Sequence, residues 1–395
     1  MNNPENSQQE KINIALIVPS LSYGGAERQV VEIARNLDRK LFQASIISLS
    51  DYSPILPMED ELRKHFYVIK KYGKLDVTVI PRLAILLRRL NIHLVHSFLF
   101  FSEIATRMAA SLIHLKPVIG SERNCNYSLA AYRYVVNRLT IDLMDLVVAN
   151  STAGAAYHAS LYGLPEERYR ILHNGVDIDR FCVRDKVQCK RNLGLDPNKV
   201  VIGMFASFKK QKNHIYFFKA VKDLIKECNV NLLLVGDTPY TSSASNTQSY
   251  KAQLMNVIRE YDLKESTIIL GNRTDVERIY SACDITVLSS LHEGTPNVVL
   301  ESFACGVPAV ITNVSDNAQI VIDGKEGYIV PVDDVAVFSE KLKRLCVDAE
   351  LRNAMAVNAR RAAEERLSTK VMSQKIADIY STAISECKGF RGLDL

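Results

Sequence analysis

The 395-residue sequence has no long hydrophobic run and no closely spaced pair of cysteines. No apolar segment approaches the roughly 20 residues that a membrane-spanning helix needs, and the polar start MNNPENSQQEK lacks the apolar core of a signal peptide. The eight cysteines form no CxxC or CxxH pair, which favours reduced thiols over a disulfide framework or a zinc site. We therefore expect a cytoplasmic protein whose contact with a membrane is at most peripheral, at the inner face of the cytoplasmic membrane.

Two common nucleotide-binding signatures are also missing. The chain has neither a Walker loop nor a GxGxxG fingerprint, which weighs against an ATPase and against a standard dehydrogenase. The net charge of +5 is too mild to indicate wholesale nucleic-acid binding, so we expect no nucleic-acid partner. Hydrophobic residues at 47% and charged residues at 24% are typical of a globular enzyme.

One segment has few acids. Residues 63–90, RKHFYVIKKYGKLDVTVIPRLAILLRRL, contain eight basic residues and a single acid, Asp76. Two interpretations are open: a solvated basic face, or a surface attracted to anionic lipid or to a diphosphate-bearing acceptor.

The length and the hydrophobic pattern predict two α/β domains. A chain of this length exceeds what one core usually supports, and helical patterns alternate with short apolar runs of strand length. Such alternation predicts parallel sheets covered by helices on both faces. The expected strands are 12–20, 43–50, 92–98, 117–122 and 145–151 in the first half, and 200–207, 231–237, 267–271, 284–290 and 307–312 in the second.

The alternation is interrupted near residue 180 and then begins again, which sets the expected domain boundary. We predict a domain over 1–178, completed by a C-terminal helix at about 370–395, and a second domain over 179–369. A helix is expected from about His214 to Glu227. Two doubly wound halves of this kind place a ligand-binding cleft at the ends of their sheets.

Two segments after the first strand of each half are suited to phosphate. Gly24 and Gly25 lie between a buried strand and a helix start, where backbone amides and the helix dipole favour an anion. At the equivalent place in the second half, ASFKKQKNH (206–214) offers three lysines that can neutralise a diphosphate. Each has a plain alternative: a turn that uses glycine for its geometry, and a solvated lysine loop.

The segment EGTPNVVLE contains two glutamates with seven residues between them. Glu293 is predicted in a loop after a strand, where it contributes little to the core, and Glu301 about one turn into the following helix. They are not placed like a retaining-glycosidase pair, whose carboxylates come from separate elements. Two acceptors with backbone amides of 295–298 between them suit a ligand with hydroxyls at both ends and phosphate in the middle, which is a sugar nucleotide.

Five motifs in the expected order carry a resemblance to a known family. They are GGAE at 24–27, NGVD at 174–177, the KN pair at 212–213, the glutamate pair at 293 and 301, and the trailing FACGVPAV. Together they resemble the retaining GT-B glycosyltransferases of family 4, group 1 type, over residues 12–331. This resemblance implies two facing Rossmann-like domains with an interdomain cleft.

The resemblance also implies roles for the matching residues. Glu301 would hold the ribose hydroxyls and Glu293 the hydroxyls of the donor sugar, while Lys212 would neutralise the diphosphate and carry most of the catalysis. Gly24 and Gly25 would close over the diphosphate from the first domain. Further donor contacts would come from Arg273, at the base edge, and from Thr295, Pro296, Asn297 and Val298. No metal and no other cofactor is implied, because lysine charge and helix dipoles serve in place of a metal.

The sequence departs from the family at three places. Ser207, which the resemblance places among the donor-binding residues, stands where the family commonly has an arginine, so Lys209 or Lys210 would supply that charge. The family's H-x-H reads HSF here, which leaves His96 either in the donor-sugar pocket as a catalytic group or in the core, with Phe98 at the second place. VGDTP at 235–239 lacks the family's second glycine. Separately, Arg123 follows a strand and is either an acceptor-binding residue or part of a structural salt bridge.

The sequence therefore predicts a retaining, metal-independent hexosyltransferase. The expected donor is a nucleotide sugar, with UDP as the favoured base, and the expected acceptor is a glycan or a polyprenyl-lipid-linked glycan in bacterial surface polysaccharide biosynthesis. Two alternatives stay open. One is a UDP-sugar 2-epimerase of similar fold, which would need further acid/base carboxylates and histidines in the cleft. The other is a non-catalytic sugar-nucleotide-binding partner protein, which Ser207 and Phe98 leave open.

Overall fold

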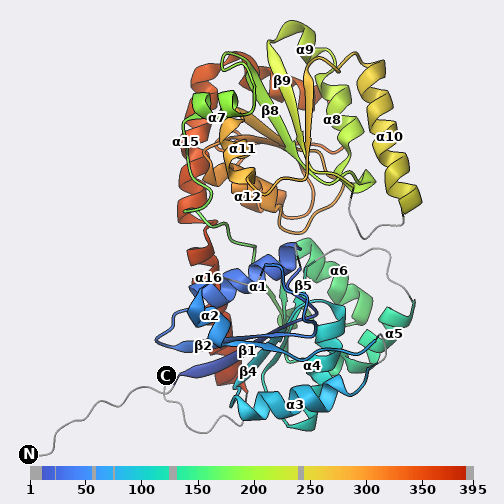
Figure 1. The fold of residues 1–395 in the computed structure, drawn as a ribbon, viewed down its shortest axis with the longest axis vertical. Helices are drawn as coiled ribbons and strands as arrows, with labels where there is room; N and C mark the ends of the chain where they lie inside the picture. Colours follow the sequence, from blue (N-terminus) through green and yellow to red (C-terminus); the bar gives the residue numbers. More distant parts are fainter. Residues whose placement is uncertain are drawn as a thin grey trace, which may run out of the picture. The chain divides into compact units, whose positions relative to one another are not determined.

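The computed structural model describes residues 11–22, 24–55, 59–73, 76–123, 131–238 and 244–387. The chain divides into two compact units (Figure 1): unit 1, Met1–Asn174 with Thr369–Leu395, and unit 2, Gly175–Ser368. The first ten residues and the last eight, including the end of the expected C-terminal helix, lie outside the described residues.

Unit 1 is built on a seven-stranded parallel sheet in the order β3-β2-β1-β4-β5-β6-β7. The strands are β1 (Ile12–Val18), β2 (Phe42–Ser48), β3 (Phe66–Val68), β4 (Leu94–Ser97), β5 (Val118–Glu122), β6 (Leu146–Ala149) and β7 (Tyr169–Ile171). The helices are α1 (Gly25–Asn36), α2 (Asp60–Lys64), α3 (Val79–Arg89), α4 (Phe100–Leu112), α5 (Ala131–Thr140), α6 (Thr152–Tyr162) and α16 (Thr369–Glu386).

Helices cover both faces of this sheet because its strands are apolar on both sides. Within β1, Ile14 and Leu16 pack with α1 and α16, whereas Ala15 and Ile17 pack with α3, α4 and α6. The last described helix, α16, thus belongs to the core of the first unit (Figure 1). Each fully buried Leu or Ile in such a core contributes about 1.5–3 kcal/mol to folding.

Unit 2 has a six-stranded parallel sheet in the order β10-β9-β8-β11-β12-β13. Its strands are β8 (Val200–Phe205), β9 (Val230–Val235), β10 (Thr267–Gly271), β11 (Ile285–Leu288), β12 (Ala309–Thr312) and β13 (Gly327–Val330). Its helices are α7 (Lys186–Asn192), α8 (His214–Val221), α9 (Leu224–Glu227), α10 (Ala244–Glu260), α11 (Val276–Ala282), α12 (Asn297–Ala304), α13 (Asn317–Ile320), α14 (Val335–Val347) and α15 (Ala349–Glu365).

The predicted fold class is confirmed: both units are doubly wound α/β structures with parallel sheets. The ten expected strands are present, but β3, β7 and β13 were not predicted. All three are edge strands without a clear apolar run: β3 and β7 have only three residues, and β13 begins at a glycine within the polar, turn-rich stretch DGKEGYIV. The helix expected from His214 to Glu227 is divided into α8 and α9 by a break at 222–223.

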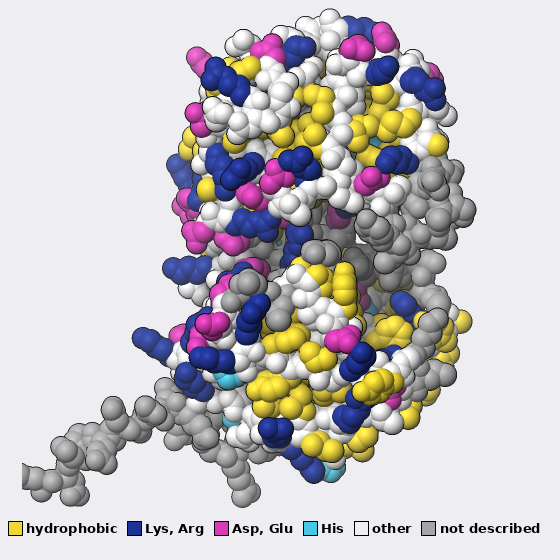
Figure 2. Space-filling model, in the orientation of Figure 1, with side chains coloured by type: hydrophobic (Ala, Val, Ile, Leu, Met, Phe, Trp, Pro, Cys, Tyr) yellow, Lys and Arg dark blue, Asp and Glu magenta, His cyan; other side chains and the backbone are white. Residues whose placement is uncertain are grey.

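The basic segment 63–90 runs from the end of α2 through β3 to the end of α3. Figure 2 shows Lys and Arg side chains beside apolar ones over α3 and α4. Of the helices described, none has both the length and the hydropathy that a bilayer crossing requires. The seven cysteines within the described residues are all free, and Cys125 lies outside them.

One buried histidine makes folding sensitive to acid. His214 at the start of α8 is 1% exposed and contacts the rings of Phe208 and Tyr250. Burial lowers the pKa of His214 from 6.5 to about 4. The His214 ring binds a proton more tightly in the unfolded chain than in the folded one. The contribution of neutral, buried His214 to the free energy of unfolding is therefore fully present above pH 6.5 and is lost as the pH falls from 6.5 toward 4.

We therefore expect His214→Gln to reduce the loss of stability between pH 7 and pH 5 by up to about 2 kcal/mol, measured by urea unfolding. Part of the loss should remain, because burial lowers the pKa of His96 and His158 as well. His114→Gln, which replaces an exposed histidine, is the control and should behave as the parent does. Equal pH dependence in His214→Gln and the parent would contradict the prediction.

Candidate active site

In unit 2, the loops that follow β8 and β11 are joined by hydrogen bonds. The two strands are neighbours and parallel, so both loops leave the carboxyl edge of the sheet. The Leu291 N–H donates to the Gln211 carbonyl at 2.9 Å, and Gln211 Nε2 donates to the His292 carbonyl at 2.8 Å. Ser289 Oγ donates to the Lys212 carbonyl at 2.9 Å. The lysine loop and the glutamate loop, far apart in the sequence, therefore form one structure.

A buried ion pair lies between these loops. Lys212 Nζ is 2.5 Å from Glu293 Oε1, which also accepts a hydrogen bond from Ser290 Oγ at 2.5 Å. The Lys212 side chain is 20% exposed and that of Glu293 10%. Ser315, in the loop after β12, donates from Oγ to the Glu293 carbonyl at 2.5 Å. Glu293 is therefore more buried, and makes more hydrogen bonds, than its predicted loop position suggested.

The start of α12 offers fewer amide donors than the sequence alone suggested. Pro296 carries no N–H, and the Asn297 N–H donates to the Thr295 carbonyl at 3.0 Å. Val298 lies in the first turn of the helix, where the dipole favours an anion. The expectation of backbone donors from all of 295–298 is therefore corrected for two of the four positions.

Glu301 lies in α12 and is held by a neighbouring helix. The hydroxyl of Tyr280 in α11 donates to Glu301 Oε2 at 2.9 Å. The Tyr280 ring is itself stacked on Phe205, with centroids 3.6 Å apart. Burial, with the carboxylate of Glu301 nearby, raises the pKa of Tyr280 well above its usual value, so the hydroxyl stays a donor at neutral pH.

The remaining predicted donor residues of unit 2 follow β8 and β10 at the same edge. Ser207 lies two residues after β8, and its carbonyl accepts from the Lys209 N–H at 2.8 Å. Arg273 follows β10 and makes a two-point contact with Asp275, at 2.8 and 2.7 Å. Gly236, after β9, has φ +136°, and a Cβ there would lie 2.3 Å from the Ala206 carbonyl oxygen. This close approach explains the single glycine of VGDTP.

The glycine turn of unit 1 already has a carboxylate beside it. Gly24 caps α1 and Gly25 is the first helical residue. Glu27 folds back over them: Ser22 Oγ donates to its Oε1 at 2.6 Å, and a Cβ on Gly24 would meet its Oε2. A phosphate at these glycines would therefore lie next to a buried carboxylate.

His96 lies in the core of unit 1. Its ring is fully buried, with Nδ1 2.7 Å from the Tyr380 hydroxyl of α16 and Nε2 2.7 Å from Ser121 Oγ. Burial lowers the pKa of His96 well below 6.5, so the ring is neutral near pH 7. This position matches the core alternative for His96, with both ring nitrogens engaged by protein groups. Phe98, also fully buried, packs on the His96 ring with centroids 4.2 Å apart.

Arg123, directly after β5, is a buried cation with unsatisfied donors. Its guanidinium lies over the Phe98 ring at 5.1 Å, and Nη1 donates to Asn174 Oδ1 at 3.1 Å. Among the described residues, Nε and Nη2 have no hydrogen-bond partner, and no carboxylate forms an ion pair with Arg123. Burial lowers the pKa of Arg123 to about 10, which still leaves it charged at neutral pH. The structural salt bridge considered from the sequence is not formed within the described part of the chain.

Comparisons with known proteins agree with this arrangement. Residues 23–180 match the family model described as Glycosyltransferase Family 4, and residues 185–362 match the one described as Glycosyl transferases group 1. The chain belongs to the group 1 glycosyltransferases, family 4. It is 26% identical to the UDP-Gal:alpha-D-GlcNAc-diphosphoundecaprenol alpha-1,3-galactosyltransferase of Escherichia coli, over 95% of this chain and 98% of that protein.

Two further relatives extend the comparison. The N-acetylgalactosamine-N,N'-diacetylbacillosaminyl-diphospho-undecaprenol 4-alpha-N-acetylgalactosaminyltransferase of Campylobacter jejuni is 24% identical, over 89% of this chain and 94% of that one. Among solved structures, Anabaena HepE in complex with UDP superposes with a TM-score of 0.77 at 21% identity, covering 94% of this chain and all of HepE. This likeness shows that the glycosyltransferase has the GT-B fold.

Several residues that shape the site of this glycosyltransferase were not singled out from the sequence. They are the three serines at 289, 290 and 315, together with Ser22, which donates to Glu27, and Tyr280, which donates to Glu301. The serines of SSLHEG at the end of β11 were a usable signal, because polar residues directly after a buried parallel strand face the ligand edge. Tyr280 carried no such signal, since it reads as an apolar helix residue.

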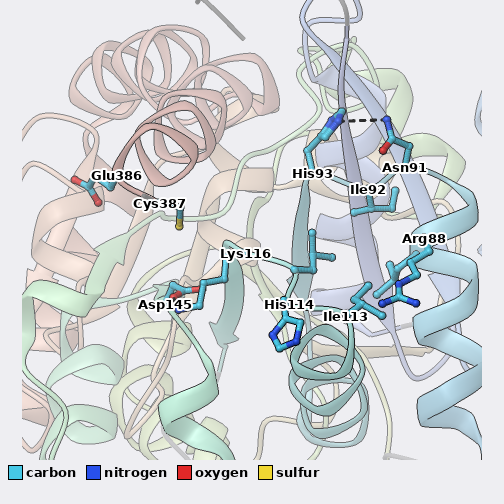
Figure 3. A pocket seen from close by; sticks show the side chains of 12 residues that line it. Arg88, Asn91, Ile92, His93, Ile113, His114, Lys116, Asp145, Glu386 and Cys387 are labelled. Atoms are coloured by element: carbon cyan, nitrogen blue, oxygen red, sulfur yellow. Dashed lines mark hydrogen bonds and ion pairs between the residues drawn. The ribbon is translucent and has the colours of Figure 1, made fainter. Parts of the chain in front are cut away.

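A cavity of about 710 Å³ lies elsewhere in unit 1, where β4, β5 and β6 begin (Figure 3). In Figure 3 the Asn91 and His93 side chains are linked, and Lys116 lies beside Asp145 with Nζ and Oδ1 2.7 Å apart. Open parallel sheets bind their ligands at the carboxyl ends of the strands. We therefore do not assign the transfer reaction to this cavity.

The ion pair of the site should also stabilise the fold. We expect Glu293→Gln and Lys212→Met each to lower the free energy of unfolding by about 1–3 kcal/mol, because each leaves a largely buried partner unpaired. The double variant should lose less than the sum of the two, measured by urea unfolding as a double-mutant cycle. Glu227→Gln, which breaks the exposed pair with Lys343 in the same unit, should cost below about 0.5 kcal/mol. Strictly additive losses at 212 and 293 would show that the pair does not stabilise the unit.

Proposed function

We propose that this glycosyltransferase moves a sugar from a UDP-sugar to a lipid-linked glycan, with retention of anomeric configuration and without a metal ion. The observation that carries the proposal is the Lys212–Glu293 pair, held at the carboxyl edge of the unit 2 sheet on the ends of two adjacent strands. The Escherichia coli relative is named for UDP-Gal and for a diphosphoundecaprenol-linked acceptor, and HepE was solved with UDP. These names support UDP as the base and a polyprenyl diphosphate as the carrier.

The donor would lie along the edge between Lys212 and α12. An ammonium has three N–H donors, and among the described residues only Glu293 accepts from Lys212, so two would serve the diphosphate oxygens. Glu293 fixes the position of that ammonium, in addition to its proposed contact with the donor sugar. Glu301, oriented by the Tyr280 hydroxyl, would accept hydrogen bonds from the ribose. Val298 and the dipole of α12 would add to the field at the phosphate.

In the reaction, the bond from the anomeric carbon to the diphosphate breaks and the acceptor hydroxyl oxygen bonds to the same face of that carbon. The acceptor proton passes to the departing diphosphate, so no separate nucleophile or base is needed. Charge grows on the diphosphate as the bond breaks, and a fixed cation there stabilises the transition state more than the ground state. Lys212 would do for the leaving group what a metal ion does in other transferases.

The reaction and the role of Lys212 can be tested together. With a glycosyl-diphospholipid acceptor, we expect UDP-sugar turnover that is unaffected by EDTA and a product whose anomeric configuration, read by proton NMR, equals that of the donor. Lys212→Ala should lower kcat by about 10²–10³-fold, as the removal of one transition-state charge contact does. Lys219→Ala, which removes an exposed lysine of α8, is the matched control and should leave kcat unchanged. An inverted product, loss of activity in EDTA or an unimpaired Lys212→Ala would each refute part of the proposal.

The acceptor would bind at the carboxyl edge of unit 1. Arg123 lines a cavity of about 300 Å³ together with Arg133 of α5 and residues of α4 and α6. Two buried N–H groups without a partner in the described chain can be satisfied by a phosphate of the acceptor. The Phe98 ring packs against the core side of the Arg123 guanidinium. An apolar residue at position 98 would therefore help to hold Arg123 in place.

For Arg123→Met we expect the KM for the acceptor to rise by about tenfold or more, while the KM for the donor stays constant. The melting temperature should hold or rise, because a buried guanidinium with unsatisfied donors is replaced by an apolar side chain of similar length. A drop in melting temperature with an unchanged acceptor KM would show that Arg123 is structural.

A further inference from the structure

Helix α5 of unit 1 has its polar side inward and its apolar side outward. Its one buried residue is the polar Asn137. Tyr132, Val135 and Leu139 are 56%, 51% and 77% exposed, and their spacing of three and four places them along one face of the helix. A helix that packs on a soluble core normally shows the reverse arrangement. Tyr132 packs edge-on against Phe100 of α4, and all three side chains remain at least half exposed.

Polar contacts attach α5 to the rest of the unit. Arg107 of α4 donates from Nη1 to Asn137 Oδ1 at 3.0 Å, and Asn137 Nδ2 donates to the Tyr162 hydroxyl of α6 at 3.0 Å. The charge of Arg107 is balanced within α4 by Glu103, at 2.9 Å. These bonds fix which side of α5 faces outward, so the exposure of its apolar residues is set by the fold.

The helices next to α5 also expose apolar side chains. Helices α3 and α4 cover one face of the sheet, and α5 packs against α4. They expose Ile85 on α3, with Met108 and Leu112 on α4. Figure 2 shows apolar and basic side chains intermixed over α3 and α4. We call this surface the α5 face, and define it by Ile85, Arg88, Arg89, Met108, Leu112, Tyr132, Arg133, Val135 and Leu139.

The charges that reach solvent on these three helices are all positive. The helices carry Arg82, Arg88, Arg89, Arg133 and Arg138, and their single acid, Glu103, is buried with Arg107. Asp76 pairs with Arg82 and Asp142 with Arg138. Within the described part of the chain, the other three arginines have no carboxylate partner. An apolar stripe with arginines at its sides is the pattern of a helix at a membrane interface.

We propose that the α5 face docks this protein on a bilayer that contains anionic lipid, with α5 lying in the plane of the headgroups. The helix has ten residues and a length of about 15 Å, half of what a bilayer crossing needs, so it can only lie along the surface. A second copy of the chain is a poorer occupant, because two α5 faces would bring arginines against arginines.

The placement of the acceptor site agrees with this docking, although this step rests on the proposed function. The cavity beside Arg123 is lined by Phe100 and Phe101 of α4 and by Arg133 and Asn137 of α5. A polyprenyl diphosphate keeps its tail in the bilayer and its phosphates at the headgroup level. Docking through α5 would bring the cavity to that level, so the acceptor would not have to leave the membrane.

Flotation of the full-length protein with lipid vesicles tests the docking. We expect binding to phosphatidylcholine vesicles that contain phosphatidylglycerol, weaker binding without phosphatidylglycerol, and a loss of binding at high salt. The double variant Val135→Ser/Leu139→Ser should bind about tenfold more weakly or worse, because it removes the apolar contact. Arg88→Gln/Arg89→Gln should bind several-fold more weakly and lose part of the salt dependence.

A matched control changes exposed apolar residues of unit 2, Val347→Ser/Val357→Ser, and should bind vesicles as the parent does. Circular dichroism should give equal melting temperatures for all variants, since the changed side chains are exposed. Parental binding in Val135→Ser/Leu139→Ser, or binding that is indifferent to phosphatidylglycerol, would overturn the proposal. So would a dimer in light scattering that this variant abolishes, because the face would then join two copies.

The affinity for UDP, measured by calorimetry in the same variants, separates this inference from the proposed function. We expect it to be unchanged, because the α5 face contains none of the proposed donor residues and Lys212, Glu293 and Glu301 belong to unit 2. If UDP binds and a short-chain acceptor is glycosylated while no variant alters vesicle binding, the membrane proposal alone fails. If vesicle binding behaves as expected but no sugar is transferred, the proposed function fails and the docking stands.

Discussion

Parallel strands constrain the rest of this structure, because every strand of a sheet ends at the same edge. In unit 2 the loops after β8, β9, β10, β11 and β12 meet there, and they contain Ser207, Lys212, Gly236, Arg273 and Glu293. Helices in the connections between the strands cover both faces of the sheet, so its edge is the part open to a ligand. Residues spread over about ninety positions are thereby brought together without any local sequence signal.

A second feature is that some charges in the interior have a partner of opposite charge and one does not. Lys212 and Glu293 neutralise each other in unit 2, and Arg107 and Glu103 do so in unit 1. Arg123 is buried with two donors that no described residue satisfies. A folded chain keeps such a costly group when a ligand completes its hydrogen bonds. Under the proposed function, the paired Lys212 belongs to the donor site, and the unsatisfied donors of Arg123 belong to an acceptor site that an anion completes.

The outer surface of unit 1 follows from how α5 is attached. Its polar contact through Asn137 with Arg107 turns the apolar side chains outward, and the arginines of α3 and α5 give that surface one sign of charge. The basic segment 63–90, which the sequence left between a solvated face and a lipid-attracted one, is only one part of this surface. The larger part lies on α4 and α5, whose composition is not conspicuously basic.

The fold class and ten of the thirteen described strands could be predicted from the sequence, because hydrophobic periodicity is a local property. Three of the four edge strands, β3, β7 and β13, could not, because their three or four residues do not form a clear apolar run. The motif resemblance also predicted the site residues. Those that belong to unit 2, including Glu293, Glu301 and Lys212, do lie at one edge of its sheet. Their roles toward a donor stay predictions until they are measured.

The sequence by itself determined that this chain forms two doubly wound α/β units and that its chemistry-bearing residues follow their strands. Only the tertiary structure decided which charges meet: Lys212 and Glu293 are 81 positions apart, and His96 and Tyr380 are 284 apart. The second of these pairs is a hydrogen bond between neutral groups, and with Ser121 it engages both ring nitrogens of His96 in the core. The tertiary structure also decided that α5 presents its apolar side outward. The physical reason is that strand order and helix attachment set such contacts, and both depend on packing across the whole unit.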